Sequence, residues 1–274
     1  MSILLPRKTI MKTPLTTVRK SLIPCLACVL LWLAVPAIKA GPISYVVVPN
    51  NRVSTVGNLV DWTDGALDFI VQQIHGRGQF PDGNLWITEF AFRMSPNTGS
   101  STTSADKFDV YLSTSPFAPN SFGMNKLITP VFADNRGPDH LLVRSGPANW
   151  SSPGCTGTAP CPFDLIVAFD RPFLFNRKNG ALLLELRIAG LTGTGGGIDA
   201  VSFDGLGGSM AVVVGYASYP SGEVDLTGDI VRFGYHLQVV PEPGAWTLVG
   251  LGVALMAVLR RNRPGKVTSP GRTD

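Results

Sequence analysis

Charged residues and histidines are scarce in this sequence of 274 residues. Charged side chains make up 15% of the chain and hydrophobic ones 45%, whereas an average soluble domain is roughly 25% charged. A disordered chain has the opposite balance, low hydrophobicity with high charge. The composition therefore predicts a folded core, and the length suits one large domain or two small ones.

The central part of the chain also lacks positive charge. The whole chain carries a net charge of +4, but residues 41–240 hold 12 of the 23 basic and 17 of the 19 acidic residues, a net charge of −5. The basic residues therefore gather at the two ends of the chain. A mildly acidic body offers no electrostatic footprint for a nucleic acid, so we predict no partner of that class.

The motifs of common hydrolases and zinc proteases are missing. Neither Gly-x-Ser-x-Gly nor His-Glu-x-x-His occurs in the sequence, and these patterns carry the chemistry of those enzymes. The three histidines are expected to be solvated or locally hydrogen-bonded: His75, His140 and His236. We predict a protein that is not an enzyme, has no catalytic residues and uses no metal or other cofactor.

Some polar and aromatic side chains leave alternatives open. Loop carboxylates can bind Ca²⁺, although beside glycines their usual place is in turns and helix caps. The candidates are Asp61, Asp64, Asp68, Asp199 and Asp204. Tryptophans can stack on sugars, although packing in a core or loop is the simpler role. The candidates are Trp62, Trp86 and Trp150.

A glycosidase would need two carboxyl groups about 5–10 Å apart across a cleft. The only glutamates of the body are Glu89, Glu185 and Glu223. Glu89 and Glu185 fall within predicted strands, where facing the solvent is the simpler interpretation. A secreted glycan-active enzyme is therefore the least favoured alternative.

The first 40 residues contain no acidic residue. A basic segment is followed by the uncharged apolar run 21–35 and then by small residues, an order typical of a secretory signal peptide. The run is shorter than the roughly 20 residues of a membrane-spanning helix. We predict that residues 1–40 are a signal peptide for the Sec machinery, cleaved after Ala37 or Ala40, with Met11 as a second candidate start.

Only two cysteines remain after removal of that segment. Cys155 and Cys161 flank five residues in a loop rich in proline and glycine. A close pair in an exported protein is typical of a local disulfide, and we predict this bond.

The body shows the periodicity of strands throughout. Apolar side chains at the odd positions of residues 231–239 alternate with polar or small ones, as in a strand with one buried face. Similar runs cover residues 43–48, 69–74, 85–94, 108–112, 141–144, 163–169, 181–188 and 210–216. About nine to twelve strands in some 200 residues favour one all-β domain over residues 41–240, an antiparallel two-sheet sandwich of jelly-roll type.

The connections between these runs are rich in glycine, proline, serine and asparagine. Asn179-Gly180 is a hairpin-type turn signal between residues 173–175 and 181–188. Residues 96–104 are predicted as a Ser/Thr-rich loop and residues 191–208 as a glycine-rich one.

Three weak features follow one another at the C-terminus. Pro241-Glu242-Pro243 ends the last strand, since proline lacks the backbone donor. The uncharged run 245–259 follows, about 22 Å long as a helix and thus a marginal transmembrane span. The arginines that mark its cytoplasmic side are Arg260, Arg261 and Arg263.

This combination resembles the PEP-CTERM sorting signal of exported bacterial proteins, here over residues 241–263. The resemblance implies recognition and cleavage by an exosortase, and association with extracellular polysaccharide or biofilm. Residues 264–274 extend beyond the usual end of such signals and are predicted as a disordered tail.

Parts of the body, such as residues 85–94 and 162–175, are similar to a recurring extracellular β-sandwich of unestablished role. That likeness implies a fold and a location and supplies no catalytic residues. We therefore expect an exported protein of the envelope or extracellular matrix, anchored in the membrane before sorting. Its role is expected to be structural or adhesive, with a carbohydrate-binding module as the alternative.

Overall fold

The computed structural model describes residues 41–61, 68–119, 128–194, 197–201, 209–225 and 227–238, with the single positions 250, 252, 253, 255 and 256. The predicted signal peptide, most of the sorting signal and the tail lie outside these residues. In the described part of the chain, no helix is long and apolar enough to span a membrane.

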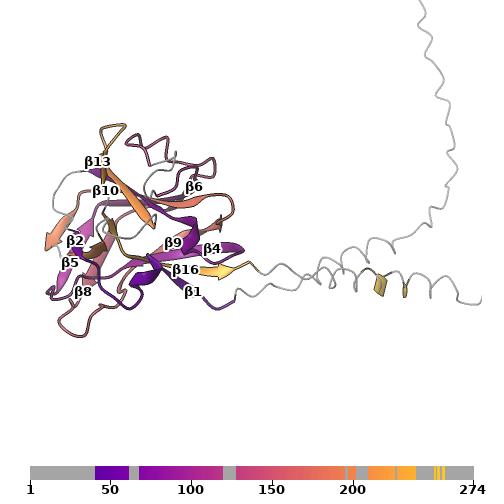
Figure 1. The fold of residues 1–274 in the computed structure, drawn as a ribbon, viewed down its shortest axis with the longest axis horizontal. Helices are drawn as coiled ribbons and strands as arrows, with labels where there is room; N and C mark the ends of the chain where they lie inside the picture. Colours follow the sequence, from indigo (N-terminus) through magenta and orange to yellow (C-terminus); the bar gives the residue numbers. More distant parts are fainter. Residues whose placement is uncertain are drawn as a thin grey trace, which may run out of the picture. The chain divides into compact units, whose positions relative to one another are not determined.

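The described body is all-β and its strand pairs are antiparallel, as predicted (Figure 1). One sheet has the order β1 (Ser44–Val48), β16 (Val231–Leu237), β4 (Asn84–Phe92) and β9 (Leu165–Asn176). The other has the order β14 (Glu223–Asp225), β13 (Met210–Tyr216), β3 (Phe69–His75), β10 (Ala181–Ala189), β6 (Lys107–Ser115) and β7 (Leu141–Arg144).

Shorter strands form two small sheets beside these. Their orders are β11 (Thr192–Thr194), β5 (Ser101–Ala105), β8 (Ala148–Ser152), and β15 (Gly228–Asp229), β12 (Ile198–Val201), β2 (Leu59–Asp61). Two short 3-10 helices, η1 (Asn50–Arg52) and η2 (Arg77–Gln79), follow β1 and β3.

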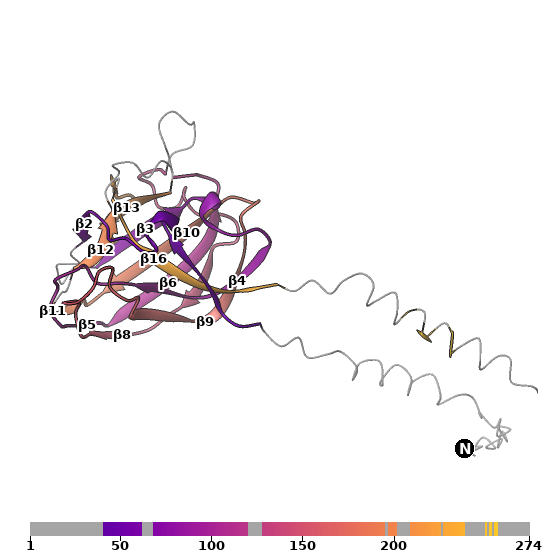
Figure 2. The same cartoon turned by 60° about the horizontal axis from the view of Figure 1, so that its bottom comes forward.

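The two large sheets face each other across one hydrophobic core (Figure 2). Alternate residues of each strand point into it, as the two-residue period requires. The four-stranded sheet contributes side chains such as Phe90, Phe175 and Phe233, and the six-stranded sheet contributes Leu182 and Leu184. These five side chains are at most 2% exposed.

Strand β9 joins two segments that are separate in the sequence pattern, residues 163–169 and 173–175. Opposite it, Ile87 pairs with Phe173 but Glu89 pairs with Ala168, so β9 bulges between the two positions. Pro172 lies in this bulge, on the outermost strand of its sheet, the kind of position where a residue without a backbone donor is tolerated.

Two expectations about connections were wrong. Asn179-Gly180 lies in a turn, but β9 before it and β10 after it belong to different sheets, so the chain crosses over and forms no hairpin. Within the predicted loops 96–104 and 191–208, β5 and β11 pair with each other. Their threonines suit strands, but three to five polar residues carry no readable apolar period.

The predicted disulfide between Cys155 and Cys161 is present, with a Cα–Cα distance of 5.8 Å. Both cysteines are buried and pack with Met94. The backbone of Cys155 also pairs with Thr98, whose carbonyl accepts a 2.9 Å hydrogen bond from the Cys155 amide. The disulfide therefore closes a short loop against the end of β4.

Arg93 is a fully buried cation at the end of β4. Its Nε donates a 2.8 Å hydrogen bond to Asp199, and its terminal nitrogens donate to the carbonyl oxygens of Arg52 and Thr55. Asp199 also accepts from the Gly57 amide at 2.8 Å. This arrangement attaches residues 50–57 and β12 to β4, so Asp199 is engaged in a structural ion pair.

His75, at the end of β3, is fully buried as well. Its ring packs edge-on against Phe233 with centroids 4.9 Å apart, and neither ring nitrogen finds a hydrogen-bond partner among the described residues. Burial lowers the pKa of His75 from 6.5 to about 3. The imidazole is therefore neutral in the folded protein.

This burial predicts a specific acid sensitivity. Between pH 6.5 and about 3 the unfolded chain binds a proton at His75 that the folded protein does not bind, so the free energy of unfolding decreases by about 1.4 kcal/mol for each unit by which the pH is lowered in this range. His75→Leu should remove this contribution. Between neutral pH and pH 5, the wild type should therefore lose about 2 kcal/mol more of its free energy of unfolding than the variant does. Urea unfolding at pH 7, 6 and 5 measures the free energy of unfolding of each protein. His236→Leu is the control, because it removes a histidine from the outer face and not from the core. Parallel pH profiles of the wild type and His75→Leu would contradict the prediction.

Candidate functional site

The connection between β6 and β7 folds back over the outer face of the six-stranded sheet. Ile128 and Phe132 from this connection pack on Ile70, Leu183 and Val213 of the sheet and form a second hydrophobic cluster. We call described residues 128–140 the covering segment. Because it shields the middle of the sheet from water, outward-facing side chains of β3 and β10 are buried.

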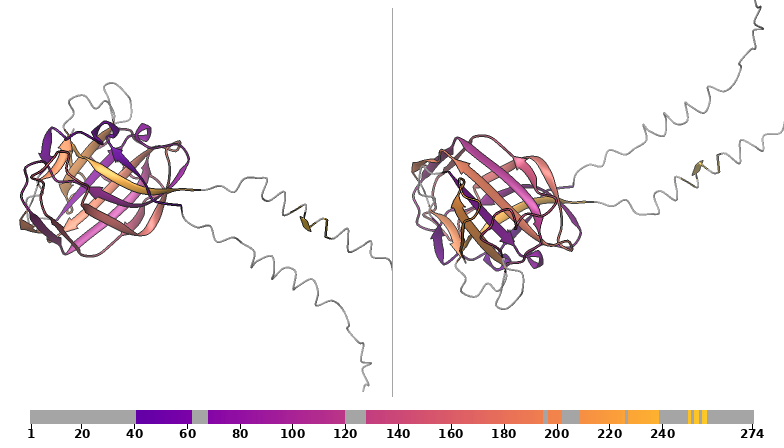
Figure 3. Two further views of the ribbon diagram at one scale, coloured as in Figure 1. Left: turned by 90° about the horizontal axis from the view of Figure 1, so that it is seen from below. Right: turned by 90° about the horizontal axis from the view of Figure 1, so that it is seen from above.

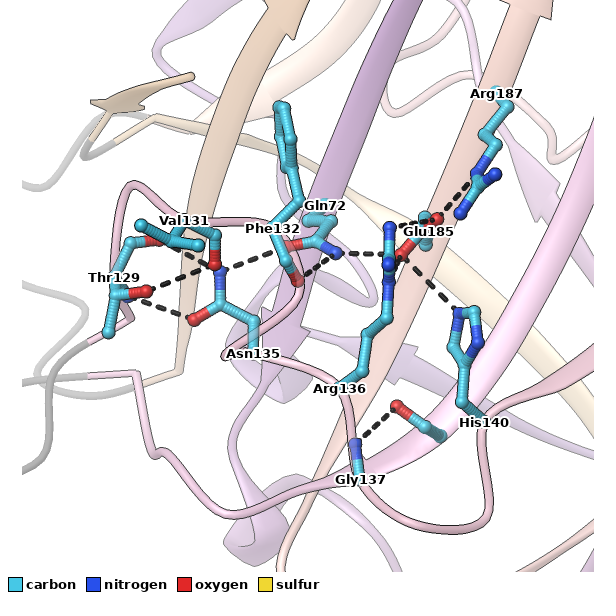
Figure 4. Close-up of polar contacts among 11 residues, drawn as sticks. Gln72, Thr129, Val131, Phe132, Asn135, Arg136, Gly137, His140, Glu185 and Arg187 are labelled. Carbon is cyan, nitrogen blue, oxygen red and sulfur yellow. Dashed lines mark hydrogen bonds and ion pairs between the residues drawn. The ribbon is translucent and has the colours of Figure 1, made fainter. Parts of the chain in front are cut away.

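Glu185 lies in the middle of β10 under this segment and is completely buried. Arg136 binds its carboxylate through two contacts, Nε to Oε2 at 2.7 Å and a terminal nitrogen to Oε1 at 3.0 Å. Arg187 donates to Oε1 at 2.7 Å, and Gln72 donates to Oε2 at 2.7 Å. His140 Nε2 lies 3.4 Å from Oε2. Figure 4 shows the five side chains converging.

The polar network continues into the covering segment. Asn135 is buried and its amide nitrogen donates to the side-chain oxygen of Gln72 at 2.9 Å and to the carbonyl of Thr129 at 2.8 Å (Figure 4). Gln72 in turn donates to the carbonyl of Phe132 at 2.9 Å. The Phe132 carbonyl of the segment is thus bonded by a side chain of the sheet, and Asn135 connects Gln72 to the segment's own backbone.

The rim of the cluster combines rings and cations. The rings of Tyr111 and His140 stack at 4.8 Å, nearly parallel, and the Arg187 guanidinium lies 4.6 Å from the Tyr111 ring centre. Side chains of Arg136, His140 and Arg187 remain 20–32% exposed. Water therefore reaches these three side chains but not the carboxylate of Glu185.

This environment keeps Glu185 ionised. Burial alone would raise the pKa of its carboxyl, but the contacts with His140, Arg136 and Gln72 and the charge of Arg136 outweigh that effect. The pKa of Glu185 is held well below its ordinary range. A carboxylate with this low pKa, saturated by donors and closed to water, is unsuited to act as a general acid or base near neutral pH.

The prediction that Glu185 faces the solvent is wrong, because its side chain is buried. Its side chain does point out of the sandwich, but the covering segment lies on top of it. The signal was present in residues 181–189, where apolar residues occupy both faces of the strand around Glu185. A strand apolar on both faces is buried on both faces.

The other sequence candidates are dispersed. His140 joins the Glu185 cluster, His75 lies in the core, and His236 is half-buried on the outer face of β16. Trp150 packs edge-on against Phe108 at 4.6 Å, which confirms a packing role. Asp68 is exposed.

The remaining candidates fall mainly on residues that are not described. Outside the described residues lie Trp62, Asp64, Asp204 and the sorting-motif residues Pro241, Glu242, Pro243, Arg260, Arg261 and Arg263. Within the described ranges, no group of three or more His, Cys, Asp or Glu side chains could hold a metal ion.

The cluster predicts that Arg136 is a structural residue. Arg136→Gln leaves a buried carboxylate with fewer partners and should destabilise the fold by about 2–4 kcal/mol. Arg177→Gln is the matched control, because its partner Asp82 is 71% exposed and such pairs contribute less than about 1 kcal/mol. Urea unfolding measures both variants, and hydrogen exchange should show residues 128–140 opening first in Arg136→Gln. Equal stabilities of the two variants would contradict this role.

Comparison with known proteins gives one positive finding. Residues 239–263 match the family model of the PEP-CTERM protein-sorting motif, in agreement with the resemblance noted for residues 241–263. Searches of curated proteins and of solved structures returned no match. The chain thus carries a PEP-CTERM sorting motif directly after its last strand, and this motif implies export, membrane-anchored sorting and processing by an exosortase.

Proposed function

We propose that this is a non-enzymatic structural or adhesive protein of the cell envelope or extracellular matrix. The sorting motif at residues 239–263 is the observation that carries the proposal. In this proposal a signal peptide over residues 1–40 directs export through the Sec machinery. The apolar run 245–259 then holds the precursor in the membrane until an exosortase removes it.

We further infer that the body is a jelly roll. Eight of its strands have the orders β1-β16-β4-β9 and β3-β10-β6-β7. Along the chain, successive members of this set alternate between the two sheets, except that β6 and β7 share one. Two facing sheets of four strands with such crossings are characteristic of that fold, and β13 and β14 extend one edge.

Two features of the body support a role without catalysis. The buried carboxylates Glu185 and Asp199 are both neutralised by arginines, which leaves neither available for proton transfer. The disulfide and the covered sheet stiffen the surface, as suits a protein that has to persist outside the cell.

Processing at the C-terminus tests the sorting proposal. Pro241→Ala with Pro243→Ala should impair recognition by the exosortase, and replacing Arg260, Arg261 and Arg263 with Ser should remove the cytoplasmic stop. The measurement is the intact mass of the protein in membrane and extracellular fractions of its native host. Extracellular protein that retains residues 260–274, unchanged when the exosortase is deleted, would contradict the proposal.

A carbohydrate-binding function is the second candidate, and the β13–β14 turn favours it. Tyr216 and Tyr219 are 53% and 61% exposed, with ring centres 6.3 Å apart. An open hollow of about 480 Å³ is lined by Asp68, Tyr216, Ala217 and Ser218. Exposed aromatic faces next to a carboxylate and a hydroxyl are suited to stacking on and hydrogen-bonding a sugar.

Substituting the tyrosines tests this candidate. Tyr216→Ala with Tyr219→Ala should abolish retention of the protein on the matrix polysaccharide of its host, while Val131→Ala, which removes another exposed apolar side chain, should not. Affinity electrophoresis in gels containing that polysaccharide measures the retention. If the double variant is retained as strongly as the wild type, this hollow is not a sugar site.

A further inference from the structure

Both ends of the body leave the fold at the same place. Strands β1 and β16 are antiparallel neighbours, and Ser44 at the start of β1 pairs with Tyr235 near the end of β16. Figure 3 shows the beginning of β1 and the end of β16 side by side at one end of the sandwich. We call this the exit end.

Only a short stretch of chain connects the exit end to the apolar run of the sorting signal. Seven residues, 238–244, separate β16 from the apolar run 245–259, and they reach at most about 25 Å when fully extended. A precursor anchored through that run therefore holds the exit end within this distance of the lipid surface.

At the exit end, the outer face of the four-stranded sheet bears a row of apolar and aromatic side chains. The strand register places Trp86 between His236 of β16 and Leu174 of β9, and extending the β1 register places Ile43 beside His236. Tyr45 lies on the same face of β1, one step further along. We call these five residues the exit patch.

Exposure is high for the aliphatic and phenolic members of the patch. Ile43 is 41%, Leu174 40% and Tyr45 52% exposed, and Leu237 at the tip of β16 is 53% exposed. The row crosses four neighbouring strands, about 14 Å at the usual strand spacing. A row of neighbouring apolar and aromatic side chains, interrupted here by the half-buried His236, is typical of an interaction surface, whereas exposed apolar residues on soluble proteins are usually scattered.

From this placement, and resting on the proposed function, we propose that the exit patch lies in the lipid–water interface while the precursor is anchored. Tyrosine and tryptophan prefer that interface because their rings are apolar and their polar groups remain hydrated. The Arg232 guanidinium lies 4.4 Å from the Tyr45 ring centre and 3.9 Å from the Glu89 carboxylate, so the charges beside the patch are paired with each other. The patch would fix the orientation of the body above the membrane and hold residues 238–244 at the surface.

A polysaccharide is the other occupant to consider. Sugar sites combine aromatic faces with several directed polar groups, whereas two of the three most exposed members of this row, Ile43 and Leu174, are aliphatic. The short connection to the apolar run also favours lipid, because it keeps the patch near the membrane.

Depth measurement in vesicles tests the proposal with the full-length chain. In a Cys25→Ala, Cys28→Ala background the closed Cys155–Cys161 disulfide leaves an introduced cysteine as the reactive thiol. A polarity-sensitive fluorophore is attached at Tyr45→Cys or Leu174→Cys, or at the control Val131→Cys on the covering segment, which is exposed to a similar degree at 37%. The unprocessed chain is inserted into vesicles of phosphatidylethanolamine and phosphatidylglycerol containing spin-labelled lipid.

The expected result is a blue shift and strong quenching by the spin-labelled lipid at positions 45 and 174, and neither at position 131. Ile43→Ser combined with Leu174→Ser should reduce the quenching at position 45, whereas Val131→Ser should not. Anchored chains whose labels at 45 and 174 stay unquenched, or whose labels respond only to added polysaccharide, would overturn the proposal. Chains that fail to co-sediment with vesicles would overturn the membrane anchoring of the proposed function itself.

Discussion

A buried charge has to be neutralised where it lies, and buried charges at two places, Glu185 and the Arg93–Asp199 pair, organise this fold. Glu185 sits in the middle of the six-stranded sheet without contact to water, and an unpaired carboxylate there would be very costly. Arg136 and Arg187 supply the opposite charge, while Gln72 completes the hydrogen bonds. Arg136 comes from the covering segment, so neutralising the carboxylate also fixes a long connection on the sheet.

The Arg93–Asp199 pair does the same at the other sheet. Its guanidinium binds the carbonyl oxygens of a loop that has no regular strand pairing of its own, and its carboxylate partner belongs to β12. In both places an irregular segment gains fixed partners from a rigid strand. Removing one partner from such a pair is more damaging than replacing the whole pair with apolar residues, which explains how a chain with few charges can depend strongly on some of them.

Nine of the strands could be predicted from the sequence because each coincides with an apolar or alternating run bounded by turn residues. Strands such as β11 and β15 could not, since two or three polar residues show no period and are held by their neighbours. The disulfide followed from spacing and the sorting motif from residue order. The burial of Glu185 depended on tertiary cover from residues 128–140, which the strand pattern alone does not reveal, although the apolar residues on both faces of β10 hinted at it.

Processing at either end would leave the sheets intact. β1 pairs only with β16 within the four-stranded sheet, and β16 is held between β1 and β4, so cleavage before residue 44 or after residue 238 removes no strand from the ladder. The core residues Val231, Phe233 and Tyr235 lie inside these limits. An anchored precursor and a released product can therefore have the same folded body. Release from the membrane would then change only the surroundings of the exit end, where β1 and β16 lie side by side.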